Sequence, residues 1–572
     1  MTSARRKAAF KTFLLATAFA ASAVPAVAQT PSAPMDDRIL QILVAKKVIT
    51  KAEAQKIQAE AAATPAPAPM PTVMPAPTPV AAPAPVPVQG GVNGDVQTIP
   101  YIPETVKNQL KAELRQEMTT KAEAEGWAKP GLVPGWLGKV RIFGDIRVRD
   151  EQDSYDKNND PSIVNWSALN TSATPYNINR AVAGSPNPSY LNTTEDRNRT
   201  RIRARLGVEY QPDSWIDFTI RAGTGNDSSP VSPNQTLGAG GGQFSKYSLW
   251  LDQADLKLTP IEGLRIDLGR TENPFWTSPL LFYPDLNFDG FWGRYRHGVL
   301  DSLDAYVTAG AFPLFNTDLN FGSNDIGAFP SHDKWLFAGQ LGAEWHPNEN
   351  FKFNGAVGYF DFDGVQGETS SPCLFSQAVC DTDITRPQFQ QFGNTMFPIR
   401  NIIADPNAAS GLSPEPQYFG LASAFRVLDI HASTDFDYFA NFPVRIEGDY
   451  INNLAFHKDQ VSARQVNLAT GVYNPGGAGW MGNFIVGKPD VAKLGDWNFQ
   501  VGYRYLQTDA TVDGLADADF HLGGTNVKGY VLMGYYGIGH GTNIGVRYFS
   551  TDVVTGAPYS NDVVQVELNT KF

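Results

Sequence analysis

From Gly138 to the C-terminus, the chain alternates apolar and polar residues with a period of two. In the segment 140–149 the even positions are apolar, from Val140 to Val148, while most odd positions are charged or polar. A period of two is typical of a β-strand with one face in apolar and the other in polar surroundings. We count sixteen such segments, at 138–149, 197–211, 214–224, 246–259, 262–270, 288–297, 301–312, 334–346, 350–362, 417–428, 441–452, 477–488, 494–507, 526–537, 540–550 and 561–572.

The connections between these segments alternate in length. A long connection (150–196) follows the first segment, a short one (211–213) follows the second, and the alternation continues to the last hairpin. Long loops at one end and tight turns at the other are typical of outer-membrane barrels, in which an even number of strands returns both termini to the periplasm. A soluble β-sandwich has no reason to keep this alternation. We therefore predict an all-β transmembrane barrel of about 16 antiparallel strands over 138–572, with 18 strands as the alternative.

The mean hydropathy of −0.26 is that of an ordinary soluble chain. Past the first thirty residues, no uncharged apolar run reaches the length of about 18 residues that a transmembrane helix needs. A protein with several transmembrane helices is thereby excluded. A barrel is not, because only alternate residues of its strands face lipid.

The N-terminus has the three parts of a secretory signal. Four cations precede the apolar stretch Thr12–Val24, and small residues at Ala26 and Ala28 provide a cleavage site. We predict a signal peptide over 1–28 that is cleaved after Ala28; a retained anchor is the alternative, although its apolar core is short for a span. Cleavage removes four positive charges from the net −12 and leaves −16, which argues against a nucleic-acid partner.

Three segments separate this signal from the barrel. Residues 29–63 include two short helices, and the second begins with a capping box at Thr50 and Glu53. Residues 64–98 form a Pro-rich linker, with ten prolines between Pro65 and Pro87. Residues 99–130 read as an amphipathic, coiled-coil-like helix, or as a solvated helix under the main domain. We expect a small α-helical periplasmic extension, with peptidoglycan as a candidate partner and a homotrimer compatible with the narrow apolar stripe of the third segment.

Two further features concern single residues of the barrel region. Cys373 and Cys380 enclose six residues of a polar stretch, and in an exported protein they are expected to form a local disulfide. On the last strand, alternate residues from Val564 to the terminal Phe572 share one face. This pattern is similar to the C-terminal signal that outer-membrane proteins present to the barrel-assembly machinery, and Phe572 is the predicted assembly signal.

Several blocks of sequence resemble the bacterial putative-porin family of outer-membrane proteins. They are YIPETVKNQLKAELRQEM, EGWAKPGLVPGWLGKVRIFGDIRVR, RTRIRARLGVEY, LGRTENPFW, DLNFDG and VKGYVLMGYYG, and they extend from about residue 99 to the C-terminus. The resemblance implies a periplasmic helical segment, a porin-like barrel embedded in outer-membrane lipid, and localisation in the outer membrane. It does not define a solute.

The predicted functional site lies in the lumen. In general porins the third extracellular loop folds inward, and here the third long connection (271–287) is rich in proline and aromatic residues. We predict that the carboxylates in and just after this connection, at Glu272, Asp285 and Asp289, stand across the lumen from inward-facing arginines. These arginines are Arg147, Arg149, Arg201, Arg203, Arg205 and Arg221. Opposed charges at a water-filled constriction orient solutes and set ion preference. The alternative is that each arginine pairs with a wall carboxylate such as Asp145.

No other motif in the sequence indicates chemistry. The segment Gly482–Pro489 has the spacing of a phosphate loop but carries Pro489 where Ser or Thr is needed, and the seven histidines show no metal-ligand spacing. The acidic loop at 150–160 fits a solvated loop better than a Ca²⁺ site. We expect no catalytic residue, metal or cofactor.

The leading functional hypothesis is a water-filled channel for passive diffusion of small hydrophilic solutes, with a preference for anions. An envelope tether anchored by the barrel and an outer-membrane enzyme are the two alternatives.

Overall fold

The computed structural model describes residues 136–572 except 227, 320–328, 439–441 and 467–472. The predicted signal peptide, helical segment, Pro-rich linker and coiled-coil-like helix therefore lie outside the described residues. Among the described residues, no helix has the length and apolar character needed to cross a membrane.

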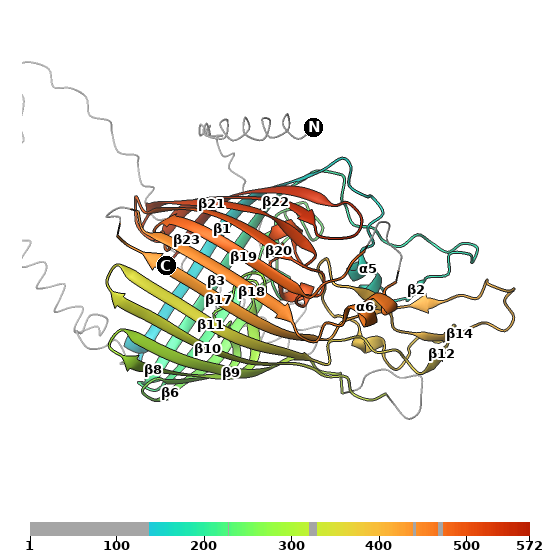
Figure 1. The fold of residues 1–572 in the computed structure, drawn as a ribbon, viewed down its shortest axis with the longest axis horizontal. Coiled ribbons are helices and arrows are strands. Elements are labelled where there is room, and N and C mark those ends of the chain that lie inside the picture. The colour runs from blue at the N-terminus through green and yellow to red at the C-terminus, as the bar shows by residue number, and fades with distance from the viewer. Residues whose placement is uncertain (1–135, 227, 320–328, 439–441, 467–472) are drawn as a thin grey trace, which may run out of the picture. The chain divides into compact units, whose positions relative to one another are not determined.

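Sixteen long antiparallel strands close into a barrel (Figure 1). They are β1 (Val140–Tyr155), β3 (Arg197–Asp213), β4 (Ile216–Gly223), β6 (Trp250–Ile261), β7 (Leu264–Glu272), β8 (Asn287–Leu300), β9 (Leu303–Phe315), β10 (Lys334–Asn348), β11 (Phe351–Asp363), β17 (Phe425–Phe436), β18 (Val444–Asn453), β19 (Ala478–Gly487), β20 (Trp497–Leu506), β21 (Val527–Gly539), β22 (Thr542–Val553) and β23 (Ser560–Lys571). The barrel closes because β1 pairs with β3 on one side and with β23 on the other. The predicted sixteen-strand barrel is confirmed, and the eighteen-strand alternative is wrong.

One strand lies away from its predicted place. The segment 417–428 was expected to be a strand, whereas β17 covers Phe425–Phe436. The residues before it form only short pieces, including β16 (Phe419–Leu421), whose side chains are buried. Phe419 packs edge-on against Trp166 of another loop, with ring centroids 4.8 Å apart. The apolar residues that the period-two pattern assigned to the barrel wall are therefore buried in contacts between loops.

The outer face of the barrel is apolar. Side chains at outward positions such as Ile142, Leu206 and Leu341 are 62%, 56% and 65% exposed. A continuous exposed apolar surface of this kind needs a lipid environment. The short turns, such as 214–215 and 301–302, lie at one end of the barrel, and the long loops lie at the other (Figure 1). By the asymmetry of outer-membrane barrels, the long-loop end is extracellular.

The long loops carry the remaining elements. These are η1 (Leu137–Lys139) before the first strand and, in the loops, α5 (Trp166–Thr171), β2 (Tyr176–Asn177), β5 (Gln235–Thr236), β12 (Pro372–Leu374), η2 (Asp383–Thr385), β13 (Met396–Pro398), β14 (Asn401–Ile403), β15 (Pro416–Gln417), β16, α6 (Lys458–Arg464), η3 (Asp513–Leu515) and η4 (Phe520–Leu522). The loops join one another, since β15 of the loop 364–424 pairs with β2 of the loop 156–196. Together they form a cap over the extracellular end.

The hydrophobic core lies inside the barrel rather than between two layers. Two loops enter the interior and pack against inward side chains of the wall: inner loop A (273–286, between β7 and β8) and inner loop B (507–526, between β20 and β21). Phe282 of inner loop A is 2% exposed, and its ring centroid lies 5.4 Å from that of Phe360 on β11. Phe520 of inner loop B contacts Phe549 on β22 at 6.0 Å between ring centroids. The burial of these aromatic residues holds both loops in place.

Candidate functional site: an arginine ladder and two inner loops

The register of β1 and β3 produces an unusual charge pattern on the inner wall. Odd-numbered residues of both strands face inward, which sets Arg147 opposite Arg203 and Arg149 opposite Arg201. Like charges directly opposite each other in adjacent strands are destabilising. We call five of the arginines of these strands the arginine ladder; they are Arg147, Arg149, Arg201, Arg203 and Arg205. The ladder therefore needs carboxylates close to its arginines.

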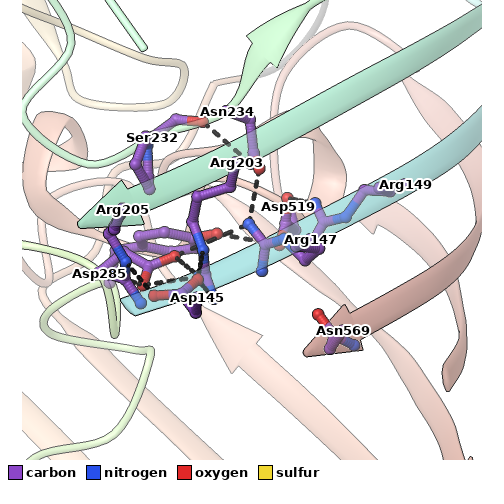
Figure 2. Close-up of polar contacts among 12 residues, drawn as sticks. Asp145, Arg147, Arg149, Arg203, Arg205, Ser232, Asn234, Asp285, Asp519 and Asn569 are labelled. Carbon is purple, nitrogen blue, oxygen red and sulfur yellow. Dashed lines mark hydrogen bonds and ion pairs between the residues drawn. The ribbon is translucent and has the colours of Figure 1, made fainter. Parts of the chain in front are cut away.

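Inner loop A supplies the first of these carboxylates. Arg203 Nη1 donates to both oxygens of Asp285, at 2.9 and 2.8 Å, and Arg205 Nη1 donates to Oδ1 at 3.0 Å (Figure 2). Arg147 Nη2 lies 3.8 Å from Asp285 Oδ2. Burial raises the pKa of Asp285, but these arginines outweigh burial and hold the pKa below its usual range.

Asp145 on β1 supplies a second carboxylate to the same arginines. Its two oxygens accept hydrogen bonds from Arg203 Nε at 2.8 Å and from Arg205 Nε at 2.7 Å (Figure 2). Arg147 instead donates to the Asn234 side-chain oxygen at 2.6 Å. Wall pairing with Asp145 and pairing with inner loop A therefore occur together, and the two alternatives that we considered from the sequence are not exclusive.

Inner loop B supplies the third carboxylate, at the next level of the ladder. Arg149 Nη1 donates to Asp519 Oδ1 at 2.7 Å, and Arg547 Nη1 donates to Asp519 Oδ2 at 2.7 Å. Arg149 is 0% exposed and also donates to Glu567 on β23 at 2.7 Å. Burial raises the pKa of Asp519, and the two arginines lower it well below its usual range. The hydroxyl of Tyr283 donates to Asp519 Oδ2 at 3.2 Å and so connects the two inner loops.

The other end of inner loop A is held by the opposite wall. The side chain of Gln340 on β10 accepts from the Trp276 backbone N–H at 3.0 Å and donates to the Trp276 carbonyl at 2.9 Å. The Trp276 ring stacks on His431 of β17, with centroids 4.0 Å apart. Inner loop A thus reaches from β10 and β17 to β3, and it crosses the barrel interior in front of the ladder.

The structure places the remaining predicted residues as follows. Arg221 on β4 pairs with Glu272 at 3.0 Å and with Asp252 at 2.5 Å. Arg201 lies 3.7 Å from Glu151 and donates to the Ser232 hydroxyl at 3.3 Å. Cys373 and Cys380 are joined by a disulfide in the loop 364–424, with Cα atoms 6.0 Å apart. They belong to the cap rather than to the ladder.

The predicted position of Asp289 is wrong. This residue pairs with Arg270 on β7 at 2.8 Å, and within the described residues no ion pair joins it to the ladder. Strand β8 begins at Asn287, so the alternation places Phe288 inside, 5% exposed, and Asp289 outside. The prediction failed because Asp289, although it lies in the predicted strand 288–297, was grouped with the carboxylates of the preceding connection.

The C-terminal residue extends the last strand by one further pair. The Phe572 backbone N–H donates to the Gly144 carbonyl at 3.0 Å, and the Gly144 N–H donates to the Phe572 carbonyl at 3.1 Å. The Phe572 side chain is 66% exposed, and the outward residues Val566 and Leu568 of the same strand are each 45% exposed.

Sequence reasoning missed several residues of this site. Asp519, Arg199 and Arg547 were not singled out, although each contacts the ladder or its carboxylates. A signal for Asp519 exists, because three aspartates occur between Asp513 and Asp519 in a connection between two strands. Among the described residues, no group of His, Cys, Asp and Glu side chains is arranged to hold a metal ion.

A closed barrel with a lipid-facing exterior and a charged interior wall crossed by an inner loop defines an outer-membrane channel of the porin class. The comparisons with known proteins agree. The family model for putative porins matches residues 35–572, and the chain belongs to that family. The predicted family and the outer-membrane location are thereby confirmed. The family and the fold indicate a channel rather than an enzyme.

Solved structures of bacterial porins are similar to this chain. OprB of Pseudomonas putida is 12% identical with a TM-score of 0.39, and the match covers 77% of this chain and 96% of that one. Salmonella typhi OmpF, solved in complex with daunomycin, is 12% identical with a TM-score of 0.37, covering 76% and 97%. The outer-membrane channel DcaP of Acinetobacter baumannii is 11% identical with a TM-score of 0.33, covering 76% and 97%. A search of the curated proteins found no significant match.

Proposed function

We propose that the protein is a passive-diffusion channel for small hydrophilic solutes whose path follows the arginine ladder and prefers anions. One observation carries this proposal: within the described part of the chain, the direct ion pairs of Arg147, Arg203 and Arg205 involve two carboxylates, those of Asp145 and Asp285. These direct ion pairs therefore have one positive charge in excess at the level where inner loop A crosses the barrel, while Asp519, Glu567 and Asp252 act on the same arginines from a longer distance. Arginine keeps its charge at any physiological pH, so this excess persists.

The arrangement of the cluster supports the proposed selectivity. A fixed positive charge beside a narrow aqueous path attracts anions and repels cations. Inner loop A is held at both ends, by Gln340 and by the ladder, so it restricts the cross-section permanently. A restricted path favours small solutes over large ones.

The channel function is tested by reconstituting the full chain. Liposome swelling with a series of sugars measures the size limit, and planar-bilayer recordings in a salt gradient measure conductance and the sign of the reversal potential. We expect swelling with small sugars and a reversal potential of the anion-preferring sign. A folded barrel that supports neither swelling nor conductance contradicts the proposal and favours an anchoring role for the barrel.

We also propose how the protein reaches and occupies the membrane. Residues 1–28 act as the export signal and are removed after Ala28, and Phe572 is read by the barrel-assembly machinery. The proposal for Phe572 is supported by its exposed side chain at the end of β23, on the lipid-facing side of the barrel. We propose further that the barrel forms homotrimers and that the N-terminal region contacts peptidoglycan. Mass spectrometry of the mature N-terminus and cross-linking in cells test these proposals.

A further inference from the structure

A polar pocket of about 380 Å³ opens at the extracellular end of β1 and β3. Its wall includes Asp153 from β1, three arginines from β3, Ser232 from the loop 224–249 and Gln391 from the loop 364–424. The three arginines are Arg197, Arg199 and Arg201. The pocket continues the arginine ladder outward, since Arg201 belongs to both. A solute that enters from outside meets this pocket before it reaches inner loop A.

The arginines of the pocket differ in how far they are neutralised. Arg199 is paired with Glu151 and lies 3.5 Å from Asp153. Arg201 is more weakly held, with Glu151 at 3.7 Å and the Ser232 hydroxyl at 3.3 Å. Arg197 donates to the backbone carbonyl of Asp196 at 3.1 Å, and the described part of the chain shows no carboxylate paired with it. A guanidinium has five N–H donors, so Arg197 and Arg201 both have donors to spare for an anion.

Asp153, in contrast, has an acceptor atom that lacks a hydrogen-bond donor among the described residues. Its side chain is 3% exposed, and within the described residues its Oδ1 atom receives no hydrogen bond. Its Oδ2 atom is the one that lies near Arg199. A buried acceptor without a donor costs free energy, and such atoms in native structures call for an explanation. Because Asp153 lines the pocket, a bound molecule with an O–H or N–H group would provide the missing donor.

We propose that this pocket binds small organic acids that carry a hydrogen-bond donor beside the carboxylate, as hydroxy acids and amino acids do. The carboxylate contacts Arg197 and Arg201, and the hydroxyl or ammonium group donates to Asp153. A neutral sugar lacks the charge for the arginines. A plain carboxylic acid leaves the Oδ1 atom of Asp153 without a donor, and sites built around a buried polar group discriminate strongly against such analogues. The assignment deepens the proposed channel function and rests on it, because it identifies the class of solute.

Isothermal titration calorimetry on the full chain in detergent at pH 8 tests the assignment. Lactate and propionate differ only in the hydroxyl group, and alanine replaces the hydroxyl with an ammonium group. We expect the Kd of lactate, of alanine or of both to be at least ten times lower than the Kd of propionate. Equal Kd values for all three acids overturn the proposal. Whether lactate or alanine has the lower Kd distinguishes a hydroxyl donor from an ammonium donor.

Variants identify the contacts. Asp153→Ala is expected to remove the preference for lactate or alanine over propionate. Arg197→Gln is expected to raise the Kd of all three acids at least fivefold. Arg180→Gln, an exposed arginine outside the pocket, is the matched control and leaves every Kd unchanged. If Asp153→Ala does not fold, Asp153→Asn replaces it and is expected to reduce the preference. A preference that survives the Asp153 substitution overturns the proposal.

The outcome is separable from that of the channel function. Conductance in planar bilayers with no discrimination among the acids overturns the pocket assignment and leaves the channel intact. Discrimination among the acids without conductance in bilayers overturns the channel and supports the binding site.

Discussion

Arg203 on β3 and Asp285 of inner loop A are joined by two hydrogen bonds, from Nη1 to both carboxylate oxygens at 2.9 and 2.8 Å. This contact ties the loop that crosses the barrel to the wall that carries the ladder. It also compensates the repulsion between Arg203 and Arg147, which face each other across adjacent strands. A single pair of residues thus links the position of the constriction to its charge.

Asp285→Asn is expected to increase anion preference. The substitution keeps the shape of the side chain and removes one of the two carboxylates shared by three arginines. In water, a unit charge about 5 Å from the path changes the energy of a monovalent ion by about 0.8 kcal/mol, which corresponds to a change of at least about fourfold in the permeability ratio. Reversal potentials in a salt gradient measure this ratio.

Asp289→Asn is the matched control for this experiment. Asp289 lies four residues further along but pairs with Arg270 on the outer side of the barrel. We expect the reversal potential of this variant to equal that of the unmodified protein. Equal shifts in the two variants would contradict the assignment of Asp285 to the path.

Asp519→Asn is expected to release inner loop B from the wall. The substitution removes one of the two carboxylates that Arg149 and Arg547 share and leaves them Glu567, and breaking a buried ion pair costs about 3–5 kcal/mol. Cleavage by chymotrypsin after Phe520, which is 3% exposed, reports the release. Asp459→Asn, at an exposed position of α6, should leave cleavage unchanged. Protection of Phe520 equal to that of the unmodified protein would show that the ion pairs do not anchor the loop.

Inner loop B is expected to be more stable at pH 5 than at pH 8. Burial raises the pKa of Asp513 to about 7 and that of Asp509 to about 6, above the value of about 3.9 in an unfolded chain. Carboxyl groups with a raised pKa bind protons more tightly in the folded state, so stability falls as the pH rises from about 4 to about 7.

His521 of the same loop acts in the opposite sense. Burial lowers its pKa to about 3, so its contribution to stability is lost as the pH falls from about 6.5 toward 3. Between pH 5 and 8 the two carboxyl groups outweigh the histidine. Hydrogen exchange of residues 507–526, corrected for the intrinsic pH dependence, measures the effect. Asp513→Asn should flatten the pH profile, and an unchanged profile in this variant would contradict the explanation.

Reduction of the disulfide is expected to affect the cap and not the channel. Cys373 and Cys380 are seven residues apart, and closing so short a loop restricts the unfolded chain by about 2.5 kcal/mol. The double variant Cys373→Ser, Cys380→Ser should therefore be cleaved faster by trypsin at Arg400 in the same loop, whose guanidinium donates to the Gln377 and Ala378 carbonyls between the two cysteines, with unchanged single-channel conductance. Altered conductance would show that this part of the cap lies on the solute path.

Period-two patterning was sufficient to predict the barrel, its strand number and the inward side of the ladder. In β1 and β3 the alternation is uninterrupted, so it identified Arg147 and Arg203 as inward-facing. The inward position of Asp285 followed from its place in the third long connection of a porin-like chain. These inferences succeeded because they depend on local periodicity and on the order of the strands along the chain.

The partners of the ladder were harder to predict, because they depend on which loops fold inward. Asp519 is separated from Arg149 by 370 residues, and no local pattern indicates that they meet. Phe419 was assigned to a strand, yet it is 0% exposed within the loop packing. Apolar loop residues that are buried against another loop cannot be distinguished from strand residues by sequence pattern alone.

The most direct test of the account is the reversal potential of the reconstituted full chain in a KCl gradient, compared with that of the variant in which Arg201, Arg203 and Arg205 are replaced by Gln. Heat-modifiable migration on gels confirms that the variant barrel is folded, and Arg203→Gln alone is measured in parallel. We expect an anion-preferring potential for the unmodified channel and a shift toward cation preference in both variants. Reversal potentials that do not change in the folded variants would contradict it.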